Sequence, residues 1–446
     1  MKLIFKVQLL VLSACLLFSC KKNEPIGPPS NHYPADVAVA WMKLQMRLNK
    51  TTKNYNNSVS GRSFAYSGIT LYESIKPGIP NGQSLVTQLV GFNASSLPLV
   101  TNKFYYWPAS ANAAMALITK DLFANTSPAN FNTIDSLEAS FNEQFKWYTT
   151  PLELQNSISF GTAVADAIYK WSKDDGEDEP YLHIFDLTYI PPAGPGLWIP
   201  TPPLFSKCVY PHWGNKRCFV ENVVSATQPG PPLAYSKDPT SEFYNMVNEL
   251  YTKSLSLTHE DSTIAKFWGD IPGNYNVPSH YVNIVNQLIV LNNLDLADAA
   301  IAYAKHGIAT NDAVISVFAT KYIYNLIRPI SYIRNEMNHP AWNTVIPTPA
   351  HPEYSAAHAV VSSASARVLE DIFGSNYSFT DHTYDALYGP RSYNTFDDYA
   401  KEAGHSRFLA GIHYNPSIAI GLIQGRKVGD MVLSALHFST HKTINK

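Results

Sequence analysis

The chain has 446 residues, of which 45% are apolar and 15% charged, and its formal net charge is −2. This length is enough for two or three domains, or for one large helical domain with a sizeable core. The composition excludes a disordered, collagen-like or disulfide-dense protein. Because 33 basic residues face 35 acidic ones, there is no basic excess to neutralise a run of phosphates, and no nucleic acid is expected as a partner.

The N-terminus has the pattern of a secretory signal. Lys2 and Lys6 precede an apolar stretch that is too short and wrongly flanked for a transmembrane helix. The stretch ends in LFSC, which resembles the lipobox of bacterial lipoproteins, and its cysteine, Cys20, is the predicted lipidation site. Cys15, at the end of LSAC, is the alternative. We therefore predict a lipoprotein signal peptide over residues 1–19 and a lipid-anchored protein of the bacterial cell envelope, periplasmic or surface-exposed.

Residues 20–33 are polar and proline-rich, which is typical of a tether between a membrane and a domain. Without residues 1–19 the chain has 31 basic and 35 acidic residues, a net charge of −4. No later segment offers about 18 uninterrupted apolar residues, so the lipid is the only membrane contact that we expect. Cys208 and Cys218 remain, and a disulfide between them is the expected pairing outside the cytoplasm. A metal site that includes His212 is the weaker alternative.

The rest of the chain predicts an all-α bundle, a single helical domain over residues 34–440. Clean two-residue alternation with hairpin turns is nearly absent, whereas apolar residues recur at intervals of three and four. The predicted helices cover residues 35–48, 63–75, 111–122, 153–173, 241–254, 281–304, 312–327, 356–373 and 417–436. A stretch rich in proline, glycine and aromatic residues interrupts them at 177–232, and we expect it to be ordered over the bundle as a lid or boundary, clipped by the disulfide.

Two cations stand near the end of the helix predicted at 312–327. Lys321 and Arg328 are seven residues apart, and seven residues turn a helix by about 700°, so both would project from one face. Pro329 marks the expected end of that helix. Two long cations there could converge on a tetrahedral oxyanion, although two cations on one face are also the common pattern of a solvated surface.

Two further segments carry histidines. The segment from His351 to His358 leads directly into an apolar helix, whose first N–H groups favour an anion. Arg407 and His413 are six residues apart, about 240° on a continuous helix, so they would not share a face. Gly411 offers a break that could bring His413 to the same site.

These three segments, in this order, resemble the shared motifs of the vanadium-dependent haloperoxidases and the type 2 phosphatidic acid phosphatase superfamily. The motifs are Lys-x6-Arg-Pro, a Pro-Ser-Gly-His-like segment and Ser-Arg-x5-His. Residues 266–270 and 278–281 are similar to the Phe-Trp…Pro-Gly-His-Trp stretch of bacterial haloperoxidase-like proteins. The resemblance spans residues 34–436, is strongest over 312–430, and implies a helical bundle that holds vanadate or a phosphoryl group in its core.

The resemblance also implies roles for the matching residues. Three cations, Lys321, Arg328 and Arg407, would bind the oxyanion oxygens. The backbone N–H of Ala357 would donate to another oxygen. In the haloperoxidase reading, Lys321 would also polarise the bound peroxide.

The histidines would perform the chemistry. The resemblance makes His358 the general acid/base. His413 would bond to vanadium in a haloperoxidase, or attack phosphorus as the nucleophile of a phosphatase. His351 resembles a second histidine of bromide-oxidising members and is a possible halide site; a loop histidine is the alternative.

Two positions depart from the family pattern. The serine of Pro-Ser-Gly-His is replaced by Ala356, with Ser355 one place early, which removes a hydroxyl donor worth roughly 1–3 kcal/mol in a buried site. The aspartate that commonly orients the second histidine is replaced by Ser417. Loss of such an orienting group costs one to several orders of magnitude in rate or metal affinity.

Three functions follow from the sequence. The first is a vanadate-dependent haloperoxidase that uses peroxide and halide, favoured by the long N-terminal half. The second is a secreted acid phosphatase that hydrolyses a phosphate ester in the same pocket with no cofactor. The third is a non-catalytic, oxyanion-binding lipoprotein, for which Ala356 and Ser417 argue.

Overall fold

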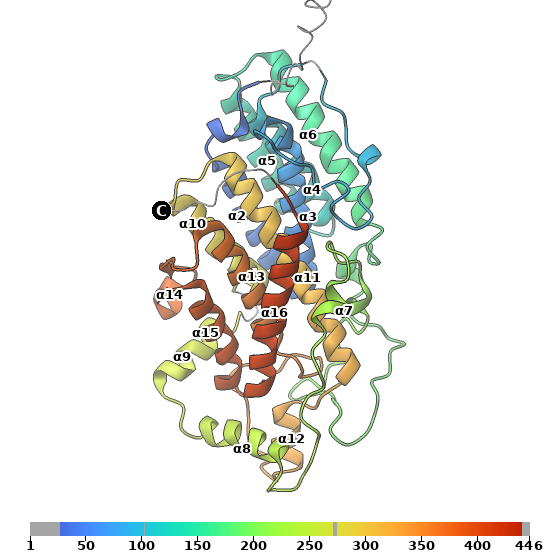
Figure 1. The fold of residues 1–446 in the computed structure, drawn as a ribbon, viewed down its shortest axis with the longest axis vertical. Helices are drawn as coiled ribbons and strands as arrows, with labels where there is room; N and C mark the ends of the chain where they lie inside the picture. Colours follow the sequence, from blue (N-terminus) through green and yellow to red (C-terminus); the bar gives the residue numbers. More distant parts are fainter. Residues whose placement is uncertain (1–26, 102, 271–273, 439–446) are drawn as a thin grey trace, which may run out of the picture.

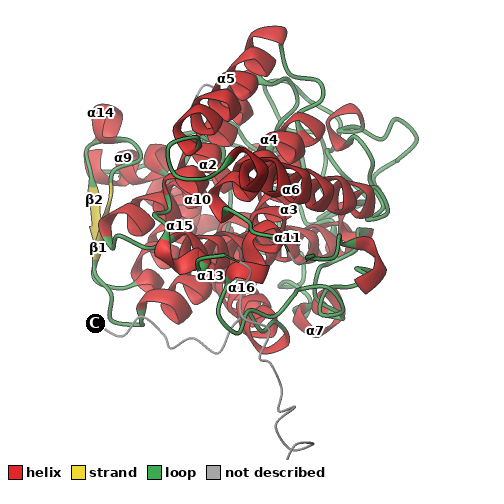
Figure 2. Cartoon of the chain, turned by 90° about the horizontal axis from the view of Figure 1, so that it is seen from above, coloured by secondary structure: helices red, strands yellow, loops and turns green. Residues whose placement is uncertain are grey.

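The computed structural model describes residues 27–101, 103–270 and 274–438. The predicted signal peptide, Cys15 and Cys20 lie outside these residues. The described chain is mainly helical, which confirms the all-α prediction. Figure 2 shows helices throughout, with a pair of short strands at one edge. No helix among the described residues is long and apolar enough to cross a bilayer.

The N-terminal half contributes five long helices. They are α2 (Asp36–Thr51), α3 (Asn57–Ile75), α4 (Trp107–Leu122), α5 (Pro128–Phe145) and α6 (Pro151–Ser172). Side-chain caps define several starts: the Asn56 side chain accepts from backbone N–H groups of α3, and Thr150 and Glu153 form a capping box on α6. Sequence periodicity missed α5, which buries little more than Ile134 and Phe145.

The C-terminal half holds the remaining helices and the strands. The helices are α7 (Val223–Thr227), α8 (Glu242–Ser254), α9 (His259–Phe267), α10 (Val277–Leu291), α11 (Leu296–Tyr324), α12 (Pro329–Asn335), α13 (Ala357–Phe373), α14 (Asp385–Tyr388), α15 (Phe396–Leu409) and α16 (Asn415–Ala435). Strand β1 (Phe379–Asp381) pairs antiparallel with β2 (Arg391–Tyr393). Helix α11 joins the two halves because it packs on both α3 and α13 (Figure 1).

The predicted break within residues 281–327 is misplaced. Helix α10 ends at Leu291, Asn293 takes the left-handed conformation, and Asp295 caps the start of α11. Residues 305–311, predicted to separate two helices, lie inside α11 instead. Gly307 within this segment lets α11 pack closely on α3, since a Cβ there would lie 2.8 Å from the Ala65 Cα.

The helix that carries Lys321 also ends earlier than predicted. Asn325 is left-handed, with φ 49°, and stops α11 at Tyr324. Arg328 is therefore the residue before α12, and Pro329 begins that helix instead of ending the previous one. The prediction that Lys321 and Arg328 project from one helical face is wrong.

The stretch at 177–232 is ordered, as predicted, but a carboxylate holds it in place of a disulfide. Buried Asp312 of α11 accepts hydrogen bonds from the backbone N–H groups of Phe219 (2.9 Å) and Val220 (3.0 Å). Burial raises the pKa of Asp312 to about 7. Ten residues farther along α11, the Tyr322 hydroxyl donates to the Val209 carbonyl of the same stretch.

Cys208 and Cys218 are free thiols, so the predicted disulfide is wrong. Cys208 adjoins Val209, the partner of Tyr322, whereas Cys218 adjoins Phe219, the partner of Asp312. Ten residues separate the two anchors on α11, which corresponds to about 15 Å along a helix. A disulfide requires Cα atoms within about 7 Å. The described residues also contain no cluster of His, Cys, Asp and Glu that could hold a metal ion, which removes the alternative with His212.

Three glycines at four-residue intervals let α16 approach α13 closely. A Cβ at Gly421 would lie 2.9 Å from the Ala356 carbonyl oxygen, one at Gly425 would overlap the Val360 carbonyl, and one at Gly429 would lie 2.8 Å from the Arg367 Cβ. This stripe fixes the distance between the two helices that follow the histidine motifs.

We expect Gly425→Ala to destabilise the fold by about 1–3 kcal/mol, because the methyl group forces the backbones of α13 and α16 apart. The sign of this change in stability is informative, since alanine in a helix is otherwise favoured over glycine by about 1 kcal/mol. Denaturant unfolding measures the change. Gly230→Ala is the matched control, because no atom lies within 4 Å of its added Cβ. A Gly425→Ala variant as stable as the control would contradict this account of the packing.

Candidate active site

The three sequence motifs converge at one buried site beside a cavity. Lys321 comes from the last turn of α11, Arg328 from the start of α12, His351 and His358 from the entry to α13, and Arg407 and His413 from the end of α15 and the turn after it. Gly411, with φ +79°, makes that turn and packs on Trp342. The predicted break at Gly411 is therefore confirmed.

A buried glutamate orients His413. The Nδ1 atom of His413 lies 2.7 Å from Oε1 of Glu353, and the same oxygen accepts from the backbone N–H of Tyr414 at 3.1 Å. The other carboxylate oxygen accepts from the Ser417 hydroxyl at 2.7 Å. The orienting carboxylate that Ser417 seemed to remove is thus supplied by Glu353, and Ser417 binds it.

The hydrogen bonds also fix where the His413 proton lies. Nε2 of His413 is 3.1 Å from a guanidinium nitrogen of Arg328. Arginine has only donors, so Nε2 accepts and keeps a lone pair, while Nδ1 carries the proton and donates it to Glu353. Burial, then the charges of Arg328 and Lys321, hold the pKa of His413 well below its usual range. His413 is neutral and carries its lone pair on Nε2.

Arg328 links the two histidine segments. Its Nε donates to the His351 carbonyl at 2.8 Å, and its Nη2 to Nδ1 of His351 at 3.0 Å. Its Nη1 donates to the Ile412 carbonyl at 2.9 Å and faces His413. Because the guanidinium is a rigid planar fork, these bonds fix the two segments relative to each other. Burial lowers the pKa of Arg328 to about 10, so it stays charged.

Arg407 keeps two donors free at the centre of the site. Its Nη1 donates to the Trp268 carbonyl at 2.8 Å and to Nε2 of His358 at 2.6 Å. Its Nε and Nη2 are buried and have no hydrogen-bond partner among the described residues. A buried unpaired guanidinium donor is costly, so these two atoms fit the oxygens of an anion. The donor set therefore fits an oxyanion, such as the vanadate that the sequence resemblance implies.

His358 accepts from Arg407 and therefore has its lone pair on Nε2. Burial, then Arg407 and His280, hold the pKa of His358 well below its usual range. Oδ2 of Asp270 lies 4.0 Å from Nε2 of His358 and, like the free Arg407 atoms, has no hydrogen-bond partner in the described part of the chain. An incoming proton would therefore find the unpartnered Oδ2 of Asp270, beside the Nε2 of His358 that Arg407 occupies.

Asp270 is also part of a buried network of hydrogen-bonded charged side chains. His280 sits between Oδ1 of Asp270 (2.9 Å) and Oδ2 of Asp381 (2.8 Å) and stacks on Trp268 at 4.7 Å. Burial opposes the charged form of His280, but the two carboxylates outweigh it and raise its pKa to about 10. The Tyr384 hydroxyl donates to Asp270 at 2.7 Å. The segments at 266–270 and 278–281 therefore support the His358 side of the site.

Lys321 is buried, and its ammonium donates to three backbone carbonyls. These belong to Pro352 (3.0 Å), Glu353 (2.8 Å) and Ser355 (2.6 Å). All three protons are used, so Lys321 holds the backbone that carries Glu353 and leads into α13. Burial and the charge of Arg328 hold the pKa of Lys321 well below its usual range. Direct contact between Lys321 and an oxyanion stays a prediction and would require the exchange of one of these bonds.

The start of α13 faces the same site. Ala356 precedes the helix and offers no side-chain cap, so the first-turn N–H groups, that of Ala357 included, lack a capping partner. Ser355 does not replace the missing serine, because its hydroxyl donates to Gln424 of α16 at 2.6 Å. The predicted loss of one hydroxyl donor at this position is therefore real.

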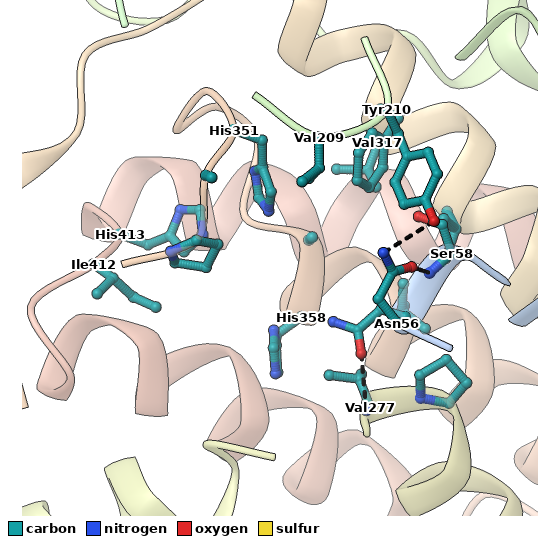
Figure 3. Close-up of a pocket in the computed structure, with 18 residues that line it drawn as sticks. Asn56, Ser58, Val209, Tyr210, Val277, Val317, His351, His358, Ile412 and His413 are labelled. Atoms are coloured by element: carbon teal, nitrogen blue, oxygen red, sulfur yellow. Dashed lines mark hydrogen bonds between the residues drawn. The ribbon is translucent and has the colours of Figure 1, made fainter. Parts of the chain in front are cut away.

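The cavity beside the site has a volume of about 220 Å³. His351, His358 and His413 lie at one end of it, and Asn56, Ser58 and Tyr210 at the other (Figure 3). Its side walls are apolar and come mainly from α11 and α13, with Val314, Val317, Phe318 and Val361. Small molecules can thus reach the His413 and His358 rings through a mostly apolar cavity.

Comparisons with known proteins agree with this geometry. A family model described as the VCPO second helical-bundle domain matches residues 301–441. The structure of a bacterial vanadium-dependent iodoperoxidase is 31% identical, with a TM-score of 0.81, over 95% of this chain and 100% of that one. The chain belongs to the vanadium-dependent haloperoxidase family. Apo- and holo-type structures of a bacterial vanadium-dependent chloroperoxidase share its fold, at 15% and 14% identity, over 90% and 94% of this chain and 94% and 95% of theirs, with TM-scores of 0.62 and 0.60. A comparison with curated proteins returns no match.

Within this family member, the structure brings together every side chain that the motifs predicted for the site. Sequence reasoning missed the roles of Glu353, Asp270 and His280. Glu353 stands inside the second motif, two residues after His351, but it is 60 residues before His413, so the sequence held no local signal for their contact. Asp270 and His280 stand in the two upstream motifs, which were noticed without an assigned role.

We expect Glu353→Gln to weaken binding of vanadate about 10- to 100-fold, because the amide no longer anchors the Nδ1 proton of His413 as a charge-assisted acceptor. Calorimetric titration of the purified protein with orthovanadate measures the affinity. Ser417→Ala is the matched control: it removes one bond to the same carboxylate but leaves the His413 contact, so its loss should be smaller. Equal losses in the two variants would contradict the orienting role of Glu353.

We also expect acid to destabilise the vanadate-free protein through His351. Burial, then Lys321 and Arg328, hold its pKa well below the usual value when folded, whereas the unfolded chain takes up a proton near pH 6.5. Stability contributed by His351 is therefore complete above about pH 6.5 and falls below it, by up to about 1.4 kcal/mol per pH unit. His351→Gln, which keeps an acceptor for Arg328, should flatten the pH dependence of urea unfolding between pH 6.5 and 5. An unchanged slope would refute this assignment.

Proposed function

We propose that the chain is a vanadate-dependent haloperoxidase that oxidises halide with hydrogen peroxide. The observation that carries the proposal is the His413 ring, whose Nε2 lone pair is fixed by Glu353 and lies next to the arginine donors. A neutral imidazole held by a carboxylate is the usual form of a metal-bonding histidine. The 31% identical relative is named an iodoperoxidase, which supports iodide as the first halide to test.

Each residue of the site has a distinct role in the proposed reaction. His413 would hold vanadate through Nε2 in exchange for its hydrogen bond from Arg328. The free Nε and Nη2 of Arg407 would bind vanadate oxygens, and the first N–H groups of α13 would donate to another. Bound vanadate would supply the Lewis acid that activates peroxide toward two-electron attack by halide. His358, neutral and with its lone pair on Nε2, would take a proton from incoming peroxide in exchange for the hydrogen bond from Arg407, and later return it.

A histidine-dependent phosphatase is the second candidate, because the same oriented imidazole suits attack on phosphorus. The Glu353–His413 pair does not separate the two reactions, since both need a neutral ring with its Nε2 free. The long N-terminal half and the match over the whole iodoperoxidase chain favour the haloperoxidase. The non-catalytic alternative rested on Ala356 and on Ser417, which stands where an orienting carboxylate is expected. Because Glu353 supplies that carboxylate, Ser417 no longer supports this alternative.

The test is a dye-halogenation assay with orthovanadate, peroxide and either iodide or bromide, run beside release of phenol from a phosphomonoester. We expect halogenation, and a loss of at least about 100-fold in His413→Ala, since this variant removes the only ring nitrogen offered to vanadium. His405→Ala is the matched control, because His405 is an exposed histidine on α15 two residues before Arg407.

No halogenation in the wild type with added vanadate would refute the proposed reaction. Phosphate release that His413→Ala abolishes and halide leaves unchanged would establish the phosphatase instead. Absence of both activities, together with vanadate binding in calorimetry, would establish the non-catalytic binding protein.

The proposed enzyme is a lipoprotein of the bacterial cell envelope, anchored through Cys20 with residues 1–19 removed. The supporting observation is the sequence pattern at residues 1–22, together with the polar tether that follows it. Mass spectrometry of the mature N-terminus distinguishes acylation at Cys20 from acylation at Cys15.

A further inference from the structure

One end of the molecule exposes a group of large apolar side chains. Phe104, Trp147, Tyr148 and Leu152 are 64%, 87%, 74% and 71% exposed. They belong to the segment before α4, the connection from α5 to α6, and the first turn of α6. We refer to these four residues as the tether face. Helices α5 and α6 lie at the upper end of the molecule in Figure 1.

Hydrogen bonds and ring contacts bring these segments together. The backbone N–H of Tyr106 donates to the Ser157 hydroxyl of α6 at 2.8 Å, which places Phe104 near the start of that helix. The rings of Tyr33 and Tyr106 meet edge to face, 5.1 Å apart. Tyr148 lines one cleft with both of them. The exposed residues therefore form one surface and are not scattered singly.

The tether reaches the folded body at this same surface. Gly27 lies against the backbone of Tyr105, where an added Cβ would be 2.6 Å from the carbonyl oxygen. Cys20 is seven residues earlier, and seven extended residues span at most about 25 Å. An acylated Cys20 therefore keeps this face within about 25 Å of the lipid surface, at a high effective concentration.

The chemistry of the face suits a bilayer surface. Tryptophan and tyrosine, with an apolar ring and one polar atom, are favoured at the level of lipid headgroups. Lys103 and Lys146 are exposed beside them and can reach phosphates while their stems cover apolar surface. Because Glu143 pairs with Lys146, the face has little net charge. Its binding should therefore depend on apolar burial more than on anionic lipid.

We propose that the tether face rests on the membrane, with the Trp147 and Tyr148 rings in the headgroup layer of the bilayer that holds the acylated Cys20. This inference rests on the lipid anchor proposed above. The sequence predicted the lipid as the only membrane contact. This proposal adds a contact that the protein itself makes with the membrane. It also accounts for four large apolar side chains that stay exposed within one surface.

Trp147 provides a direct reporter. The chain has eight tryptophans, and the other seven are at most 9% exposed. Acylated full-length protein is reconstituted into phosphatidylcholine vesicles, and quenching of tryptophan emission by brominated lipid is measured, with flotation of the vesicles to confirm anchoring. We expect part of the emission to be quenched, in 0.5 M salt as well as in low salt, and Trp147→Phe to remove the quenchable part.

A triple variant, Phe104→Ser with Tyr148→Ser and Leu152→Ser, keeps Trp147 and should reduce its quenching by about twofold or more, since it removes most of the buried apolar area. The matched control changes Leu187, Ile190 and Leu204 to serine. These residues are 74%, 86% and 81% exposed, in the 177–232 stretch that follows the far end of α6, and they should leave quenching unchanged.

Protein that floats with the vesicles but shows no quenching of Trp147 overturns the proposal. Loss of quenching through self-association, detected by sedimentation, would assign the face to a second copy of the chain and also overturns it. Protein that does not float refutes the anchor and this inference together. Dye halogenation on the same samples is independent of all three results, so failure here is distinguishable from failure of the proposed reaction.

Discussion

The site depends on the contacts that the buried Glu353 makes among the positively charged side chains around it. Lys321, Arg328 and Arg407 are at most 1% exposed, and charges so far from water are stable only when paired and fully hydrogen-bonded. Glu353 binds His413, and Lys321 binds the backbone carbonyl of Glu353 and those of its neighbours. Arg328 satisfies its donors on carbonyls and imidazole nitrogens. Among the three cations, Arg407 is the one with two guanidinium nitrogens, Nε and Nη2, that have no hydrogen-bond partner in the described residues, and these are left to an external anion.

The scaffold holds the anion-binding atoms in place through the contact between α13 and α16. The glycine stripe on α16 brings that helix against the backbone of α13, from the Ala356 carbonyl onward. Helix α16 begins two residues after His413, and α13 begins one residue before His358. The spacing of the two helices therefore fixes the spacing of the two histidines. Close-packed backbone contacts resist small displacements, which suits a site whose donors need positions accurate to a fraction of an ångström.

The sequence predicted which residues meet at the site better than how they meet. Lys321 and Arg328 were placed on one helical face, but Asn325 ends the helix between them. They converge instead because α12 starts in a new direction.

The all-α class followed from periodicity, whereas the break at Asn293 was obscured by apolar residues on both sides. Glu353 could not be assigned from spacing, because its contact with His413 spans 60 residues and forms only after folding. The Cys208–Cys218 disulfide failed for the same reason: ten residues of separation say nothing about which parts of α11 each cysteine adjoins.

The distance between the tether face and the cavity has a chemical consequence. Helix α3 links the two regions, because Asn56 and Ser58 at its start line the cavity and the carbonyl of Ile75 at its end accepts from Ser30, three residues after Gly27. A helix of 19 residues is about 28 Å long. With the tether face on a bilayer, the cavity lies at most roughly 28 Å farther from the lipid surface than the tether face, the full distance applying only if α3 stands along the membrane normal. In the proposed orientation, hypohalous acid would leave a cavity at the end of α3 that is remote from the tether face.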